Sequence, residues 1–280
     1  MTSRRFTWLA VPPLLAIAAS LGGCDRLFGT APDPVATPSP SAAPTPSASA
    51  AATASVDGAK QVREETDTFL FEYSWPTEAG EIPALAQWLQ TRLDRKREQL
   101  ANDARRGREA ARGNGFPFNQ YSSDTKWTVV ADIPGWLSMS AELSSYEGGA
   151  HGNFGYDTMV WDKTRNVALE PIGFFTSAEA LDGVLGERLC EELNAERARR
   201  RRDAVPEGTD DLFNACVTPD ETNVLLGSES GEKFDRIGIQ IAPYIAGPWA
   251  EGTYDFSFDV DDDILAIVRP EYREAFAQRN

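Results

Sequence analysis

A single histidine, His151, limits the chemistry that this 280-residue chain could perform by itself. A zinc-dependent deacetylase needs two imidazoles and a carboxylate on the metal, and a His-Glu-x-x-His hydrolase needs two histidines on one helix. A Ser/His/Asp triad would have to use His151, but the sequence lacks a Gly-x-Ser-x-Gly nucleophile turn. Phosphate-loop and dinucleotide-binding motifs are also missing. We therefore expect no catalytic residues, no metal site and no cofactor in this polypeptide.

Carboxylates are the remaining candidates, because a pair of them can cleave a glycosidic bond. Glu142, Glu147 and Asp157 lie close in sequence to one glycine-rich segment. However, the chain contains 43 acidic residues, so a neighbouring pair is expected by chance. A cell-wall hydrolase that uses carboxylates is kept as the alternative interpretation.

The glycine-rich segment 147–153 contains His151 and separates two predicted strands. A lone imidazole there could orient a ligand or respond to pH. It could instead satisfy backbone groups of a turn whose glycines permit unusual backbone angles, and we favour this structural role. The segment could still border a binding cleft, for which the candidate residues are Tyr146, Gly148, Gly149, His151, Gly152 and Asn153.

The elements that position this segment follow from hydrophobic periodicity. Apolar and polar residues alternate over 67–75, which predicts a half-buried strand. Leu85, Leu89, Leu93 and Leu100, together with Trp88, recur at helical spacing over 82–112, which predicts a long amphipathic helix. Strand patterns over 125–133, 137–146 and 154–161 predict an antiparallel meander with a Pro-Gly turn.

A second long helix is predicted to start at the capping box Thr176–Glu179. Its far end carries Arg197 and residues 199–202, which we interpret as a solvated, cationic helix terminus. The order of helices and strands favours an α+β fold with antiparallel sheets, two main helices and two small lobes packed together. The remaining predicted elements are strands at 222–226, 234–241 and 252–260 and a short helix at 261–269.

The first 23 residues are typical of an export signal, with Arg4 and Arg5 before a short apolar run. The run ends in Leu-Gly-Gly-Cys, which resembles the site cleaved by lipoprotein signal peptidase, so we expect lipid on Cys24. An ordinary secretory signal and an uncleaved anchor are the alternatives. Asp25 resembles an inner-membrane retention signal of enteric lipoproteins, and we leave the choice between inner and outer membrane open. We expect a lipid-anchored protein of the cell envelope that faces the periplasm.

Residues 24–59 are rich in Ala, Pro, Ser and Thr, which predicts an extended tether. Removing Arg4 and Arg5 with the signal leaves 25 of the 27 basic residues against 43 acidic ones, a net charge of −18. That charge argues against nucleic acid as a partner and favours cationic partners, although solubility alone would also explain it. In an oxidising compartment Cys190 and Cys216 are expected to form a disulfide, with two free buried thiols as the alternative.

Three motifs resemble the tandem domains found in the lysozyme-sensing anti-sigma factor RsiV and in the non-catalytic part of the peptidoglycan deacetylase PdaC. Tyr146–Asn153 is similar to the aromatic-x-Gly-Gly-Ala-His-Gly-Asn motif of that family, and Ile239–Gly247 is similar to a strand that ends in a Tyr-containing turn. Leu169–Phe175 is similar to the family's Leu-x-x-Leu-Phe stretch but departs from it. The resemblance spans roughly residues 65–262 and implies a two-lobed α+β envelope module whose best understood relative binds lysozyme.

Together these features predict four parts of the chain: a signal peptide at 1–23, a tether at 24–59, a PdaC-like lobe at 60–165 and an RsiV-like lobe at 166–280. We expect a non-catalytic binding protein. Its expected partners are the membrane, through the N-terminal lipid, and either a cationic protein such as a lysozyme-like hydrolase or peptidoglycan. For a glycan ligand, Trp136 and Trp249 are the stacking candidates.

Overall fold

A computed structural model of the chain describes residues 52–56, 58–203, 205 and 213–279. The predicted signal peptide, Cys24 and nearly all of the predicted tether lie outside the described residues, so those expectations stay predictions. In the part that the structure describes, no helix is long and apolar enough to cross a membrane.

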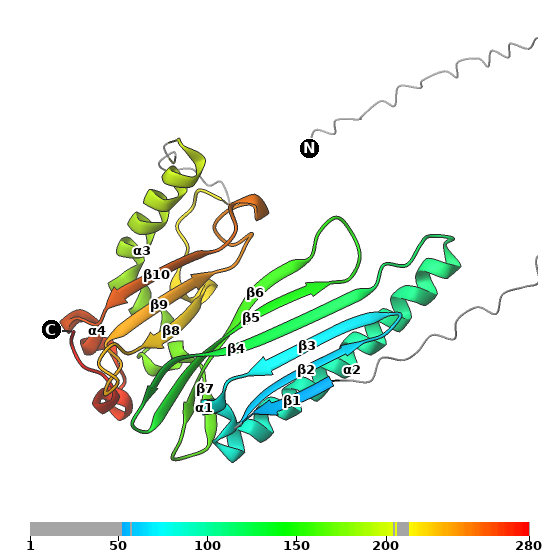
Figure 1. Cartoon of the computed structure of the whole chain (residues 1–280). Coiled ribbons are helices and arrows are strands. Elements are labelled where there is room, and N and C mark those ends of the chain that lie inside the picture. The colour runs from blue at the N-terminus through cyan, green and yellow to red at the C-terminus, as the bar shows by residue number, and fades with distance from the viewer. Residues whose placement is uncertain (1–51, 57, 204, 206–212, 280) are drawn as a thin grey trace, which may run out of the picture. The chain divides into compact units, whose positions relative to one another are not determined.

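A seven-stranded sheet forms the first half of the fold, with its strands in sequence order (Figure 1). Neighbouring strands are antiparallel except β3 and β4, which are parallel. That exception follows from α2 (Pro83–Gly113), because a parallel connection needs a long crossover and the helix supplies it. The strands are β1 (Ala52–Val56), β2 (Ala59–Glu65), β3 (Phe69–Trp75), β4 (Tyr121–Ile133), β5 (Trp136–Tyr146), β6 (Asn153–Asp162) and β7 (Val167–Leu169).

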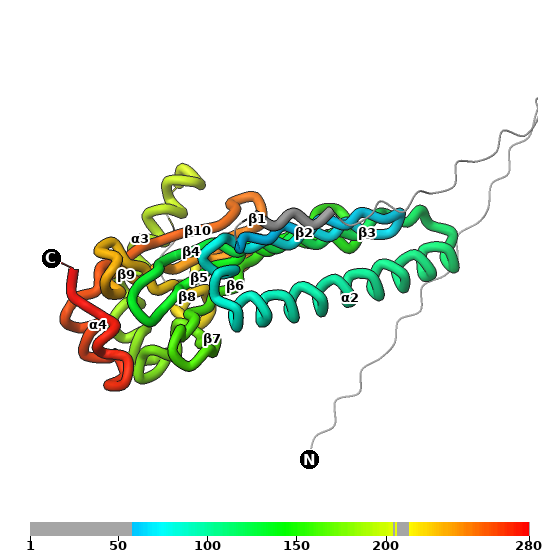
Figure 2. Tube along the Cα trace, turned by 60° about the horizontal axis from the view of Figure 1, so that its bottom comes forward, coloured from blue at the N-terminus to red at the C-terminus, as the bar shows by residue number. Residues whose placement is uncertain are grey.

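Helix α2 runs along one face of this sheet (Figure 2). A short helix, α1 (Thr77–Gly80), precedes it. The buried leucines of α2 at 85, 89, 93 and 100 pack on the alternating aromatic side chains of β3 and on Trp127 of β4. One extra residue in β4, between Val129 and Ala131, shifts the register. Ala131 and Ile133 therefore pack into a different core from Trp127.

The second half of the fold is a three-stranded antiparallel sheet covered by α3 (Ala178–Arg201), as Figure 1 shows. Four leucines of α3, at 181, 185, 189 and 193, recur at i, i+4 and are buried in the same core as the isoleucines of β9. Cys190 of α3 forms a disulfide with Cys216. The elements are β8 (Asn223–Gly227), β9 (Arg236–Ile241), β10 (Tyr254–Asp259), α4 (Asp262–Ile267) and short 3₁₀ helices at Pro171–Phe174, Pro219–Glu221, Trp249–Glu251 and Pro270–Ala275.

The small sheet lies against the face of β4–β6 that points away from α2. Ser140 of β5 donates a hydrogen bond to Gln240 of β9 at 2.7 Å, and Val160 of β6 is buried in the core of the small sheet. The α+β class with largely antiparallel sheets and two long helices is therefore confirmed. The predicted boundary between residues 165 and 166 stays a prediction, and β7, which follows it, pairs with β6.

Two local predictions are wrong. The N-cap of α3 is Ser177, whose hydroxyl accepts from the Ala180 backbone N–H, so the cap lies one residue later than the predicted capping box. Strand β4 begins at Tyr121, four residues earlier than predicted, because its polar first residues pair with β3 in the sheet and needed no apolar alternation.

Candidate functional site

Two connections from different halves of the fold meet at His151. The first is the glycine-rich segment between β5 and β6, and the second joins β9 to β10. The imidazole of His151 stacks on Trp249 with the ring centroids 4.6 Å apart and the planes 17° apart. The hydroxyl of Tyr244 lies 3.1 Å from His151 Nε2. We call His151, Tyr244 and Trp249 the aromatic cluster.

The hydrogen bonds of His151 define how its ring is protonated in the neutral form. Nδ1 lies 2.8 Å from the carbonyl oxygen of Gly152, which can only accept, so Nδ1 carries the proton. Nε2 is then an acceptor, and the Tyr244 hydroxyl donates to it. Nε2 therefore joins the two connections, whereas Nδ1 holds the ring within its own connection.

Part of the aromatic cluster remains accessible to a partner. Tyr244 is 47% exposed and the adjacent Ile245 is 38% exposed. Tyr244 has a φ of 71°, a backbone conformation that is rare for an aromatic residue. A hydrogen bond from the Tyr244 N–H to the carbonyl of Gly247 holds this turn. An exposed aromatic residue held in such a backbone conformation is a candidate recognition residue.

The other predicted site residues shape the glycine-rich segment. Gly148 and Gly149 have φ values of 89° and 105°, which a side chain would disfavour. The hydroxyl of Tyr146 donates to the carbonyl of Gly149. Asn153 is exposed and pairs with Ser145 at the start of β6. Of the predicted site residues, His151 belongs to the aromatic cluster. The others shape the segment that carries His151.

Gly152 is required by a close backbone approach. A Cβ atom at this position would lie 2.6 Å from the carbonyl oxygen of Ser145. We expect Gly152→Ala to lower the free energy of unfolding by about 1–2 kcal/mol, because the backbone must shift to relieve the clash. Gly155→Ala is the matched control, since a Cβ there meets no atom within 4 Å. Urea unfolding of both variants measures the difference, and equal midpoints would contradict the prediction.

Tyr244 was missed as a site residue, and the two tryptophan candidates differ in their surroundings. Trp249 stacks on His151 as described above. Trp136 instead packs edge-on against Phe174 and Tyr272, with centroid distances of 5.2 and 5.9 Å. It is therefore part of a core rather than a stacking platform. Two signals pointed to Tyr244: its place in a Pro- and Gly-containing turn after a strand, and the family resemblance of Ile239–Gly247.

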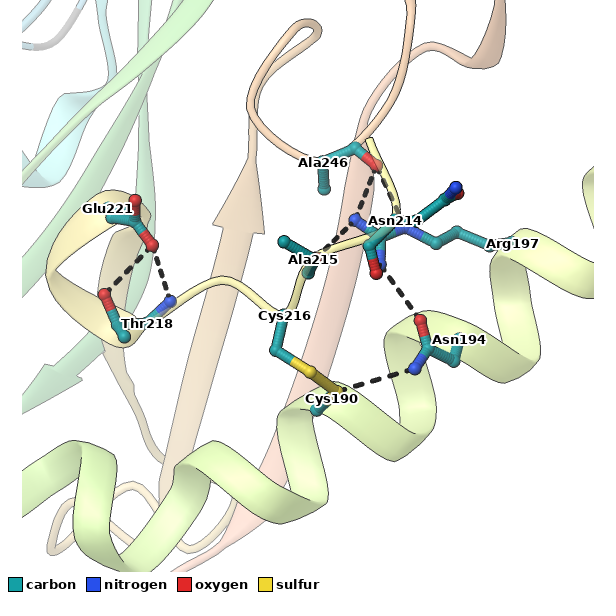
Figure 3. The surroundings of a disulfide bond; sticks show 9 residues. All are labelled: Cys190, Asn194, Arg197, Asn214, Ala215, Cys216, Thr218, Glu221 and Ala246. Atoms are coloured by element: carbon teal, nitrogen blue, oxygen red, sulfur yellow. Dashed lines mark hydrogen bonds between the residues drawn. A yellow bond between two sulfur atoms is a disulfide. The ribbon is translucent and has the colours of Figure 1, made fainter. Parts of the chain in front are cut away.

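The end of α3 holds the connection that carries Tyr244. Arg197 is completely buried, and its Nε and one terminal nitrogen donate to the carbonyl of Ala246 at 2.9 and 2.7 Å. The same guanidinium donates to the carbonyls of Asn214 and Ala215, next to the disulfide (Figure 3). Interpreting Arg197 as part of a solvated helix terminus was therefore wrong, because its donors fit a cage of backbone acceptors.

Two further arginines hold the second half of the same connection. Arg200 donates to the carbonyls of Glu251 and Thr253 at 2.6 and 2.7 Å. Arg201 forms a two-point ion pair with the Glu251 carboxylate. Burial opposes ionisation of Glu251, but hydrogen bonds from Arg201 and Tyr254 outweigh it and hold its pKa below the usual range. Burial and the Glu251 contact raise the pKa of Tyr254 to about 12.

The candidate carboxylates do not form one cluster. Glu142 lies opposite Tyr156, whereas Asp157 lies opposite Ala141, so Glu142 and Asp157 point to opposite faces of the sheet. Asp157 forms an ion pair with Arg92 of α2. Glu147 lines a separate small pocket together with Lys96 of α2. Glu142 and Asp157 therefore cannot flank one glycosidic bond, as the two carboxylates of a glycosidase must.

The open part of the large sheet carries an acidic surface. Glu72, Asp124 and Glu142 lie on neighbouring strands β3, β4 and β5, on the face that points away from α2. Burial raises the pKa of Asp124, and the charges of Glu72 and Glu142 raise it further. Lys126, opposite Glu142, partly compensates this charge. Within the described ranges, no group of three or more His, Cys, Asp or Glu side chains is arranged to hold a metal ion.

Comparisons with known proteins agree with the resemblance found in the sequence. Residues 62–154 match a family model described as deacetylase PdaC, which confirms the PdaC resemblance for the segment from β2 to the start of β6. The matched segment includes the glycine-rich connection with His151 and ends before Tyr244 and Trp249. The comparison with curated proteins gave no match.

Two solved structures are similar over most of the chain. A DUF3298 family protein from Pseudomonas aeruginosa PAO1 is 15% identical, with 79% of this chain and 97% of that chain covered and a TM-score of 0.47. A DUF3298 family member from Bacteroides fragilis NCTC 9343 is 14% identical, with 80% of this chain and 96% of that chain covered and a TM-score of 0.46.

Proposed function

We propose that this chain, whose residues 62–154 match the PdaC family model, is a non-catalytic binding protein of the cell envelope that binds a cationic protein such as a lysozyme-like hydrolase. The observation that carries the proposal is the aromatic cluster. It joins both halves of the fold and leaves Tyr244 and Ile245 half exposed. Tyrosine and tryptophan are enriched among the residues that contribute most to protein–protein binding.

The charge of the chain supports a cationic partner. The acidic surface of Glu72, Asp124 and Glu142 lies on the sheet face to which the small sheet also packs. A net charge of −16 for the whole sequence would accelerate the encounter with a basic protein. The anchor through Cys24 and the Pro-rich tether would place this surface outside the cytoplasm, facing the periplasm, where such hydrolases act. The single histidine argues against the deacetylase chemistry that the family name describes.

A binding experiment with lysozyme as the basic probe tests the proposal. We expect the mature chain with Cys24→Ser to bind lysozyme at low salt and to lower its activity. Tyr244→Ala and Trp249→Ala should each weaken binding at least about ten-fold, because truncating a central aromatic anchor removes buried apolar contact. Affinity is measured by calorimetry at two salt concentrations.

The matched control is Phe116→Ala, which removes an exposed aromatic side chain outside the aromatic cluster. It should bind lysozyme as the unmodified chain does. Failure of the unmodified chain to bind or inhibit lysozyme at low salt would rule out this partner. Equal losses for Phe116→Ala and Tyr244→Ala would rule out the aromatic cluster as the contact surface.

Peptidoglycan is a second candidate ligand, favoured by the stacked Trp249 ring beside the exposed Tyr244, since sugars stack on aromatic faces. Retention of the chain on isolated peptidoglycan, lost in Trp249→Ala and kept in Trp136→Phe, would favour the glycan. Release of muropeptides from the same material, abolished by Glu142→Gln, would instead favour the carboxylate hydrolase.

A further inference from the structure

The end of α2 and the connection to β4 form a basic surface on an acidic protein. Between Ala104 and Gln120 the sequence contains four arginines and a single acidic residue, Glu109, whereas the whole chain has 43 acidic and 27 basic residues. We call this surface the basic tip and define it by Arg105, Arg106, Arg108, Arg112 and Phe116.

Within the basic tip, two arginines form ion pairs, two do not, and the phenylalanine is exposed. Arg106 pairs with Asp103 and Arg108 pairs with Asp67. Arg105 and Arg112 make no ion pair within the part of the chain that the structure describes. Phe116 is 71% exposed, more than any other large apolar side chain of the described part. Favourable contact with the helix dipole explains cations at this position, but it does not explain an exposed phenylalanine just after them.

The predicted tether enters the fold at the same end of the sheet. Strand β1 starts at Ala52, which pairs with Arg63, near the end of β2. The next turn carries Asp67, the ion-pair partner of Arg108. Phe69 at the start of β3 pairs with Tyr121 at the start of β4, just after the basic tip. The start of β1 and the end of α2 therefore lie at one end of the large sheet (Figure 1).

We propose that the basic tip docks on the anionic headgroups of the membrane that holds the lipid anchor, with Phe116 entering the interface. Charges farther away than about 8 Å are screened at physiological salt, so the tip acts through its own arginines, of which Arg105 and Arg112 have no ion pair in the described part of the chain. Basic residues near an anionic membrane and an exposed aromatic ring are the usual combination for such surfaces. The proposal rests on the envelope location and is independent of the aromatic cluster.

Vesicle binding tests this proposal without a protein partner. The mature chain with Cys24→Ser, which cannot be acylated, is sedimented with vesicles of phosphatidylcholine with or without about one third phosphatidylglycerol. We expect binding only to the anionic vesicles, with loss at high salt. The pair R105Q/R112Q should weaken binding about 25-fold, because each arginine near the surface contributes about five-fold. Phe116→Ser should also weaken it.

The matched control is R199Q/R202Q, which removes the same charge from the end of α3 and should bind as the unmodified chain does. The proposal is overturned by equal binding to both kinds of vesicle, by no binding to anionic vesicles at low salt, or by equal losses for the two double variants. Tyr244→Ala should leave vesicle binding unchanged. Failure of the lysozyme experiment and failure of the membrane proposal are therefore distinguishable.

Discussion

Replacing Arg197 with methionine should lower the free energy of unfolding by about 2–4 kcal/mol, one of the two largest effects expected in this chain. Methionine fills much of the same volume but has no donors. The carbonyl of Ala246 would lose its charged donor in a buried place, and the partly exposed carbonyls of Asn214 and Ala215 would lose theirs. A buried acceptor without a partner costs about 1–3 kcal/mol, and the two partly exposed carbonyls add a smaller cost because water replaces their donor only in part.

The same substitution should also release the connection that carries Tyr244. His151 is the only histidine, so its imidazole gives a single set of NMR signals in the whole chain. Stacking on Trp249 shifts those signals by the ring current of the indole. In Arg197→Met we expect the signals to move toward the values of an unstacked histidine at temperatures where the protein is still folded. If Arg197 only stabilised the fold and did not position the connection, the His151 signals of the folded protein would not move.

Arg188→Met is the matched control on the same helix. Arg188 is 41% exposed and pairs with Asp261 at 2.9 Å, and exposed pairs of this kind contribute at most about 1 kcal/mol. The histidine signals should not move in this variant. The positioning role of Arg197 would be disproved if both variants lost similar stability, or if the His151 signals were unchanged in Arg197→Met.

The strands and helices could largely be predicted because burial imposes a period on them. The leucines of α2 and α3 and the alternating aromatic residues of β3 each face a core, and that requirement is visible in the sequence. Strands β1 and β2 were missed because β2 has a single buried position, Val62, and no run of apolar residues. Parallel pairing of β3 with β4 was missed because the sequence around a helix does not reveal which strands it connects.

The candidate site could be predicted only in part, for a different reason. The glycine-rich segment is visible because positive φ angles and the close approach at Gly152 demand glycine. Its partner, Tyr244, lies 93 residues away and meets His151 only through the packing of the two sheets. The role of Arg197 was hidden for a similar reason. An arginine near a helix end usually faces water, and its three backbone acceptors come from segments that the sequence does not place beside it.

Removing the disulfide with Cys190→Ser and Cys216→Ser should lower the free energy of unfolding by about 3 kcal/mol. The bond closes a loop with a sequence separation of 26 residues, and the chain-entropy model gives a cost of that size when such a loop is opened in the unfolded state. Thermal unfolding of the double serine variant measures the change. A Tm equal to that of the unmodified chain would contradict the prediction.

The disulfide and Arg197 should not act independently, because both hold the segment 214–216 against α3. Cys216 is bonded to Cys190, and the preceding carbonyls of Asn214 and Ala215 accept from Arg197 (Figure 3). Once either constraint is lost, the segment can move and the other constraint has less to hold. Combining the serine variants with Arg197→Met should therefore cost at least about 0.5 kcal/mol less than the sum of the separate losses. Strict additivity would mean that the disulfide does not contribute to positioning the connection that presents Tyr244.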